Sequence, residues 1–78
     1  MNHYDRRKII RSIIDSDTIS QAIDRLNLPE EHKILLRVVY VRHGCLDDVC
    51  DITHKEYSTV SKWHKEDLIK LVSLLQNR

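Results

Sequence analysis

Residues 45–65 read CLDDVCDITHKEYSTVSKWHK. Apolar side chains in and just after this segment share one face at helical spacings of about three and four residues. They form two groups, Leu46, Val49 and Cys50 in the first and Val60, Trp63 and Leu68 in the second. Polar residues separate the groups. The pattern predicts two helices that are joined by a tight turn and meet along an apolar seam.

The second helix of this pair carries small polar and basic side chains on its other face. Two helices joined in this way are the layout of a helix-turn-helix, whose second helix enters the major groove of DNA. Hydroxyl groups can bond to bases or phosphates, and lysine supplies a positive charge for phosphate. We therefore expect seven residues to contact double-stranded DNA: Lys55, Tyr57, Ser58, Thr59, Ser61, Lys62 and Lys65. The simpler interpretation is the solvated face of an amphipathic helix.

The upstream half predicts three more helices. Repeating isoleucines place the first at about residues 4–14, and capping side chains at residues 16–18 open the second, which runs through Leu26. The third begins with Pro29 at its first position and ends in basic residues before Gly44, which we expect to be left-handed. With the last helix running through Leu75, the chain is predicted to be one all-α domain of about five helices over residues 1–78.

Composition supports a small helical domain. The chain has 78 residues, of which 41% are hydrophobic, and it has a single glycine and a single proline, too few for the turns of an all-β fold. Charged residues make up 32% but nearly cancel, leaving a net charge of +1. Nucleic-acid binders are usually more basic, so any DNA contact must rely on local clusters. One such cluster is predicted to make secondary phosphate contacts, or else to be a solvated face: Arg6, Arg7, Lys8 and Arg11.

Several function classes lack support in the sequence. No apolar run approaches the ~20 residues of a membrane span, and the N-terminus does not resemble a signal peptide. We therefore expect a cytoplasmic protein with two free thiols. The group His43, Cys45, Cys50 and His54 lacks the paired spacing of a zinc site. No phosphate loop or nucleophile-and-base grouping occurs, so we expect no metal, no cofactor and no catalytic activity.

Residues 28–71 contain a series of short motifs: Leu28-Pro29-Glu30, Tyr40 with Gly44, Leu46-Asp47-Asp48-Val49 and Ser58-Thr59-Val60-Ser61-Lys62. In this order they resemble region four of bacterial sigma factors. The continuation over residues 62–68 is similar to phage late-gene regulators of the ArpU and RinA type. This resemblance implies a helix-turn-helix at about residues 45–66. It also implies a transcription regulator of phage or mobile-element origin that can contact RNA polymerase.

The turn of this segment differs from the family pattern. His54 and Lys55 stand where the family has glycine and a small apolar residue, and Glu56 stands where serine or threonine caps the second helix. Residues 53–56 also fit a capping box, which would begin the second helix three residues earlier.

An alternative function and a mode of association follow from the surface of the last helix. The alternative is a sigma-like module that binds RNA polymerase or another regulator without reading DNA. The near-neutral charge and the acidic residues Glu56, Glu66 and Asp67 favour it. Ile69 lies opposite Val60 on the last helix and is expected to be exposed, with Val72 partly so. Self-association through this helix, or its docking on polymerase, would cover both.

Overall fold

The computed structural model describes residues 3–12 and 15–76, and these form five helices with no strand. The predicted all-α fold is confirmed. The third helix, α3, continues directly into a π-helical turn, η1. The elements are α1 (His3–Ser12), α2 (Ser16–Arg25), α3 (Glu30–Leu36), η1 (Arg37–Val41), α4 (Leu46–Thr53) and α5 (Tyr57–Gln76).

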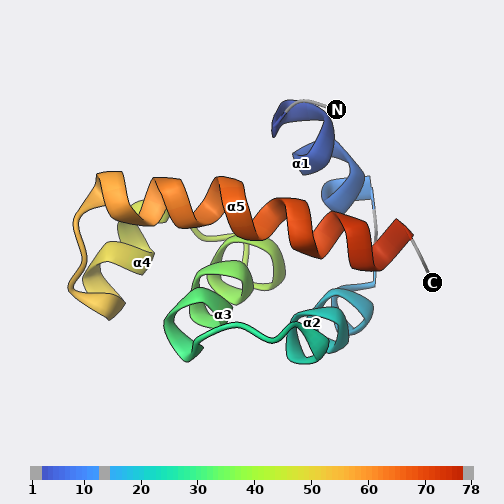
Figure 1. Cartoon of the computed structure of the whole chain (residues 1–78), viewed down its shortest axis with the longest axis horizontal. Coiled ribbons are helices and arrows are strands. Elements are labelled where there is room, and N and C mark those ends of the chain that lie inside the picture. The colour runs from blue at the N-terminus through green and yellow to red at the C-terminus, as the bar shows by residue number, and fades with distance from the viewer. Residues whose placement is uncertain (1–2, 13–14, 77–78) are drawn as a thin grey trace.

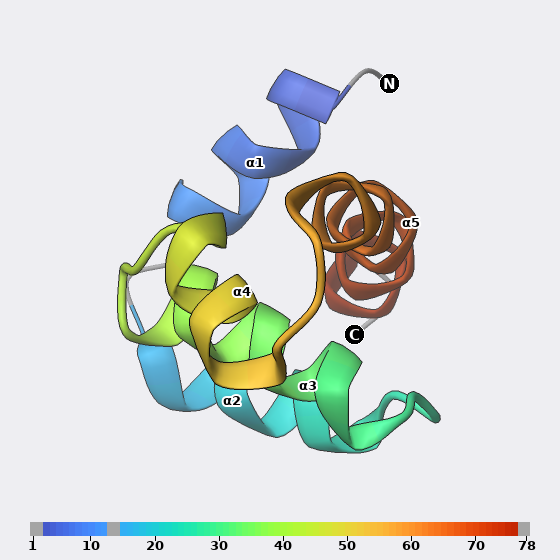
Figure 2. The ribbon, with the colours of Figure 1, turned by 90° about the vertical axis from the view of Figure 1, so that its left-hand side faces the viewer.

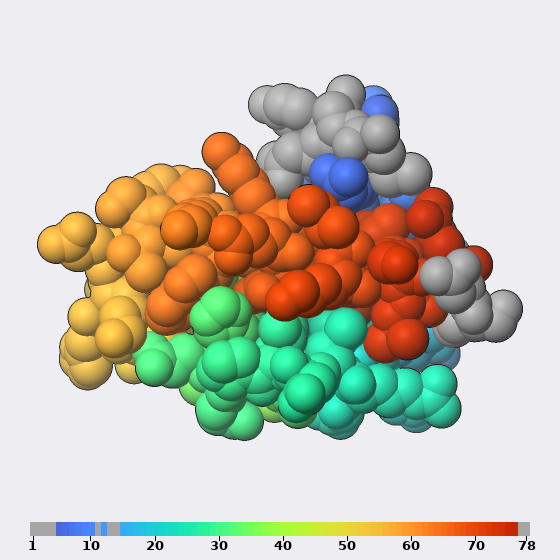
Figure 3. Space-filling model, viewed as in Figure 1, coloured from blue at the N-terminus to red at the C-terminus, as the bar shows by residue number. Residues whose placement is uncertain are grey.

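Helix α5 is the element around which the others are arranged. It runs along the long axis of the molecule, with α1 on one side and α2, α3 and α4 on the other (Figure 1). Seen end-on, α5 has α1, α4, α3 and α2 beside it in an arc (Figure 2). The space-filling view shows the outer side of α5 as a continuous band across one face (Figure 3). One long side of this helix therefore forms the core and the other forms surface.

The core lies between α5 and the helices of the arc. Val49 of α4 and Val60 and Leu68 of α5 are fully buried, and Leu46, Cys50 and Trp63 are partly buried against the core. Ile69 is 47% exposed, as expected, but Val72 is buried, and the prediction of its partial exposure is wrong. The remaining buried apolar residues are Ile10, Ile19, Ala22, Ile23, Leu35, Leu36, Val38, Val39, Tyr40, Leu71 and Leu75.

The helix starts differ slightly from their sequence-based positions. Helix α2 begins at Ser16, but its cap is Asp15, whose carboxylate accepts hydrogen bonds from Asp17 N at 3.0 Å and Thr18 Oγ1 at 2.9 Å. Pro29 is the residue before α3 rather than its first position. The first helix ends at Ser12, and residues 13–14, which the sequence placed in it, lie outside the described part of the chain.

The connection into α4 reverses the expected roles of two residues. His43 has the left-handed backbone, with φ 60°, whereas Gly44 has no positive φ, so the prediction for Gly44 is wrong. Gly44 is instead crowded, because its N donates to Val38 O at 2.7 Å. A Cβ at this position would lie 2.9 Å from both Val38 Cγ1 and Asp48 Oδ2. Glycine is required here for close approach.

Candidate nucleic-acid interface

The start of α4 is fixed by its own acidic residue. Asp48 Oδ2 accepts a hydrogen bond from Cys45 N at 3.0 Å and one from Cys45 Sγ at 3.4 Å. The hydrogen bond from Cys45 N satisfies a backbone donor that the start of a helix leaves without an intrahelical partner. Cys45 and Asp48 form the capping box of α4, which fixes the residue at which this helix begins.

The turn between α4 and α5 consists of residues 54–56. His54 has φ 59° and ψ 33°, the left-handed geometry that glycine usually supplies, and its N donates to Cys50 O at 2.8 Å. Thr53 belongs to α4, and its hydroxyl donates to Val49 O at 2.8 Å. The alternative capping box at residues 53–56 is therefore wrong, and α5 begins at Tyr57. A turn of this length is typical of two helices that cross steeply in a helix-turn-helix.

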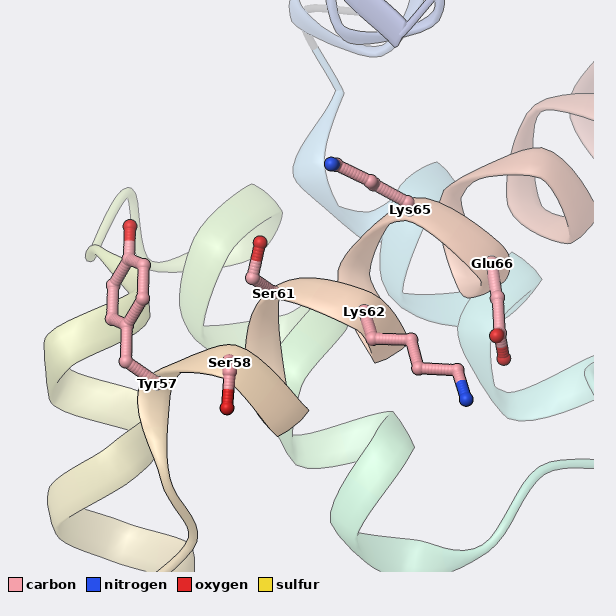
Figure 4. A pocket seen from close by; sticks show the side chains of 6 residues that line it. All are labelled: Tyr57, Ser58, Ser61, Lys62, Lys65 and Glu66. Atoms are coloured by element: carbon pink, nitrogen blue, oxygen red, sulfur yellow. The ribbon is translucent and has the colours of Figure 1, made fainter.

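The N-terminal half of α5 presents most of the predicted contact residues together. Ser58, Lys62 and Lys65 are exposed at successive helical spacings, and Tyr57 is exposed beside them. With Ser61 they line an open surface depression of about 530 Å³ (Figure 4). The remaining lining residue is Glu66, which adds a negative charge one turn after Lys62. We call the exposed row Ser58, Lys62 and Lys65 the α5 stripe.

Two of the predicted contact residues do not line this depression. Lys55 is exposed in the turn, and Thr59 is half-buried on the flank of α5. The predicted secondary contacts lie on α1, which packs against α5. Lys8 is exposed there, Arg6 and Arg7 are half-buried, and the side chain of Arg11 lies outside the described part of the structure.

A buried ionisable pair holds the inner side of α5. Asp67 is 1% exposed, and its Oδ2 lies 2.7 Å from Nδ1 of His32 on α3. The imidazole also stacks on Trp63, with ring centroids 4.3 Å apart and planes 25° apart. Burial raises the pKa of Asp67, although the neighbouring His32 lowers it in part. Ionised Asp67 therefore needs His32 to offset the cost of taking its charge out of water.

A second histidine contact joins α5 to the π-helical turn. Tyr40 Oη and His64 Nε2 lie 2.5 Å apart, within hydrogen-bond distance, and His64 is 4% exposed. Neither contact was predicted from the sequence, and the interpretation of Asp67 as a surface acid is wrong, because its side chain is buried. A signal was present, because Asp67 follows the buried Val60 by seven residues and precedes the buried Leu71 by four.

No group of three or more histidine, cysteine or acidic residues in the described ranges could hold a metal ion. Both cysteines are free, as predicted. No helix within residues 3–12 or 15–76 has the length and apolar character needed to cross a membrane.

In comparisons with known proteins, no family model, curated protein or solved structure matches the chain. The resemblance to region four of sigma factors stays a prediction that rests on its sequence motifs. A function has to be inferred from the side chains that the structure describes.

Proposed function

We propose that the chain binds double-stranded DNA through the N-terminal half of α5 and acts as a small transcription regulator. The observation that carries this proposal is the α5 stripe, which is exposed directly after a three-residue turn and is backed by α4. A major groove about 12 Å wide accepts one α-helix, and short side chains such as serine allow its close approach. The sigma-like motifs of the sequence support the same use of α5.

The contacts divide by chemistry. Lys62 and Lys65 supply positive charge for phosphates, and the hydroxyls of Ser58 and Ser61 reach base edges or phosphate oxygens. Lys55 and Tyr57 lie where the backbone of the duplex would pass the start of α5. The basic residues of α1 would supply further phosphate contacts. Because Glu66 borders the stripe, we expect modest affinity that depends strongly on the match to the preferred sequence.

Replacing Lys62 by alanine is expected to weaken binding to a duplex selected from a random-sequence pool. The loss is about 1–3 kcal/mol for a base-edge contact, and smaller and independent of sequence for a phosphate contact. Lys70→Ala is the matched control, because it removes the same charge from an exposed position farther along α5. Fluorescence anisotropy measures the affinities. Equal affinities of the parent and Lys62→Ala, with the fold intact, would remove Lys62 from the interface.

The exposed acidic face of α4 favours the alternative function. Asp47, Asp48 and Asp51 are exposed there, and Ile52 beside them is 50% exposed. Such a surface repels phosphate and suits a basic protein segment, such as one on RNA polymerase. Salt separates the two functions, since the logarithm of DNA affinity falls by roughly 0.9 per phosphate contact per tenfold rise in salt. Flat salt dependence, or binding of polymerase alone, would favour the alternative.

Replacing Ile69 by glutamate is expected to abolish self-association of the chain. Ile69 continues the line of the α5 stripe, and a second copy that covers it would let two α5 helices read two half-sites. Sedimentation equilibrium checks this, with Gln21→Glu as the control that adds the same charge at an exposed polar position on α2. A parent that is monomeric at all concentrations tested would remove the dimer.

A further inference from the structure

Two side chains of opposite charge extend from neighbouring turns of α5 on one side of the depression. Figure 4 shows the Lys62 ammonium and the Glu66 carboxylate pointing to the same side, whereas Lys65 points to the other. Both Lys62 and Glu66 are exposed, and no ion pair joins them in the described part of the chain. A hydrogen-bond donor and an acceptor therefore lie one turn apart on the surface that is proposed to face DNA.

The side chains that line the depression differ in what they can distinguish in a base pair. Hydroxyl groups, such as those of Tyr57 and Ser61, both donate and accept, so they fit either kind of base edge. The ammonium group of lysine only donates. Among the described residues that line the depression, Glu66 is the one whose side chain, as a carboxylate, accepts hydrogen bonds and donates none. It therefore places the strictest requirement on the base that it faces.

A carboxylate in the major groove needs a donor from a base, because phosphates and acceptor atoms repel it. The donors on the major-groove edges are the amino groups of cytosine and adenine. Adenine presents the acceptor N7 beside its N6 amino group, whereas cytosine presents N4 alone. Cytosine is therefore the base that suits Glu66. Guanine, with its acceptors O6 and N7, suits the ammonium group of Lys62.

The spacing of the two side chains limits where these bases lie. Residues four apart are separated by about 6 Å along a helix axis, and successive base pairs by about 3.4 Å. Lys62 and Glu66 therefore reach base pairs that are no more than about two steps apart. Residues 54–66 contain no arginine, asparagine or glutamine, which are common base-reading side chains. Discrimination between bases in this segment thus falls to its lysines and to Glu66.

We propose that Glu66 is a specificity-determining residue, which accepts a hydrogen bond from N4 of a cytosine in the major groove while Lys62 donates to a nearby guanine. This inference rests on the proposed function and names the class of sequence that the same surface selects, a site with closely spaced C·G and G·C pairs. It also gives the negative charge beside the stripe a role. Glu66 lowers the affinity for duplexes that offer it no amino group, and so it separates the preferred site from others.

Glu66→Gln tests the assignment, because it keeps the size of the side chain and replaces the carboxylate by an amide, which pairs with N6 and N7 of adenine. Duplexes are selected from a random-sequence pool with the parent and with the variant, and both sets are sequenced. The parent is expected to select cytosine at one position. Glu66→Gln is expected to select adenine there, with the rest of the site unchanged. Identical selected sites would overturn the inference.

Glu56→Gln is the matched control, because Glu56 is an exposed acid in the turn and does not line the depression. It removes the same charge, so it is expected to raise the affinity for all duplexes alike and to leave the selected site as in the parent. The thermal midpoint of each variant shows whether its fold is intact. If Glu56→Gln changed the selected site in the same way as Glu66→Gln, the effect would be one of general charge, and the inference would be wrong.

Fluorescence anisotropy then measures the discrimination on the site that the parent selects. Replacing the assigned C·G pair by T·A puts the acceptor O4 where N4 was. This change is expected to weaken binding of the parent at least about fivefold, and binding of Glu66→Ala about twofold at most.

Three outcomes separate the inference from the proposed function. Equal losses for the parent and Glu66→Ala would overturn the inference and leave DNA binding intact. A parent that binds DNA but selects no sequence would do the same. If the parent binds no duplex in low salt, the proposed function fails instead, and the inference fails with it.

Discussion

Replacing Leu68 by alanine is expected to lower the free energy of unfolding by about 2–5 kcal/mol. Leu68 is 0% exposed in the middle of α5, where the helix meets the others, so truncation leaves a cavity that rigid neighbours cannot fill. A domain of this size has only about 0.05–0.15 kcal/mol of stability per residue. The substitution therefore removes a large share of the total, and urea unfolding followed by circular dichroism measures it.

The neighbouring Ile69 supplies the control. Ile69→Ala removes a side chain of similar size from the exposed side of the same helix, and it should change stability by no more than about 0.5 kcal/mol. If the two variants were equally stable, the assignment of inner and outer faces along α5 would be wrong. The position of the α5 stripe would then be wrong as well.

Replacing Gly44 by alanine is expected to destabilise the domain by about 1–3 kcal/mol, the usual effect of forcing an extra carbon into a packed site. The new Cβ would meet the side chains of Val38 and Asp48 and would lie 3.2 Å from Val38 O. Moving Asp48 away would also break its hydrogen bonds to Cys45 at the start of α4. The shift of the thermal midpoint, measured by calorimetry, checks this expectation.

The adjacent residue should respond in the opposite direction. His43→Gly places glycine at the left-handed position, where a side chain costs about 1–2 kcal/mol. The gain exceeds the roughly 0.5–1 kcal/mol that glycine loses in chain entropy, so stability should rise by up to about 1 kcal/mol. A stabilising Gly44→Ala would contradict the close approach at Gly44, and a destabilising His43→Gly would contradict the strain assigned to the left-handed backbone of His43.

The sequence predicted the parts of the fold that depend on periodicity. Leu46 and Val49 share one face of α4, and Val60 shares one face of α5 with Leu68. Hydrophobic burial requires only that each face turn inward, so the burial of Val49, Val60 and Leu68 followed from spacing alone. The exposure of Lys62 and Lys65 followed from the same pattern. Most of the predicted contact set lies around one depression for this reason, although its use in DNA binding stays a proposal.

Features that depend on contacts between distant residues were not predictable. Nothing near Asp67 in the sequence indicates that His32, thirty-five residues earlier, would reach its carboxylate. An acidic side chain is normally assigned to the surface, and only a tertiary partner allows its burial. The π-helical turn is a similar case, because residues 38–41 are all apolar and carry no signal that separates a π turn from an α turn.

The position of α1 implies two levels of cooperativity in this small domain. Its main contact is with α5, and the buried side chain of Ile10 lies on it. Helix α5 packs against α1, α2, α3 and α4. Detaching α1 thus breaks its contact with α5 and leaves the contacts among α2, α3, α4 and α5 in place, whereas detaching α5 breaks contacts with all four other helices. Amide hydrogens of α1 are accordingly expected to exchange through a subglobal opening, and those in the middle of α5 only when the entire chain unfolds, which native-state hydrogen exchange measures.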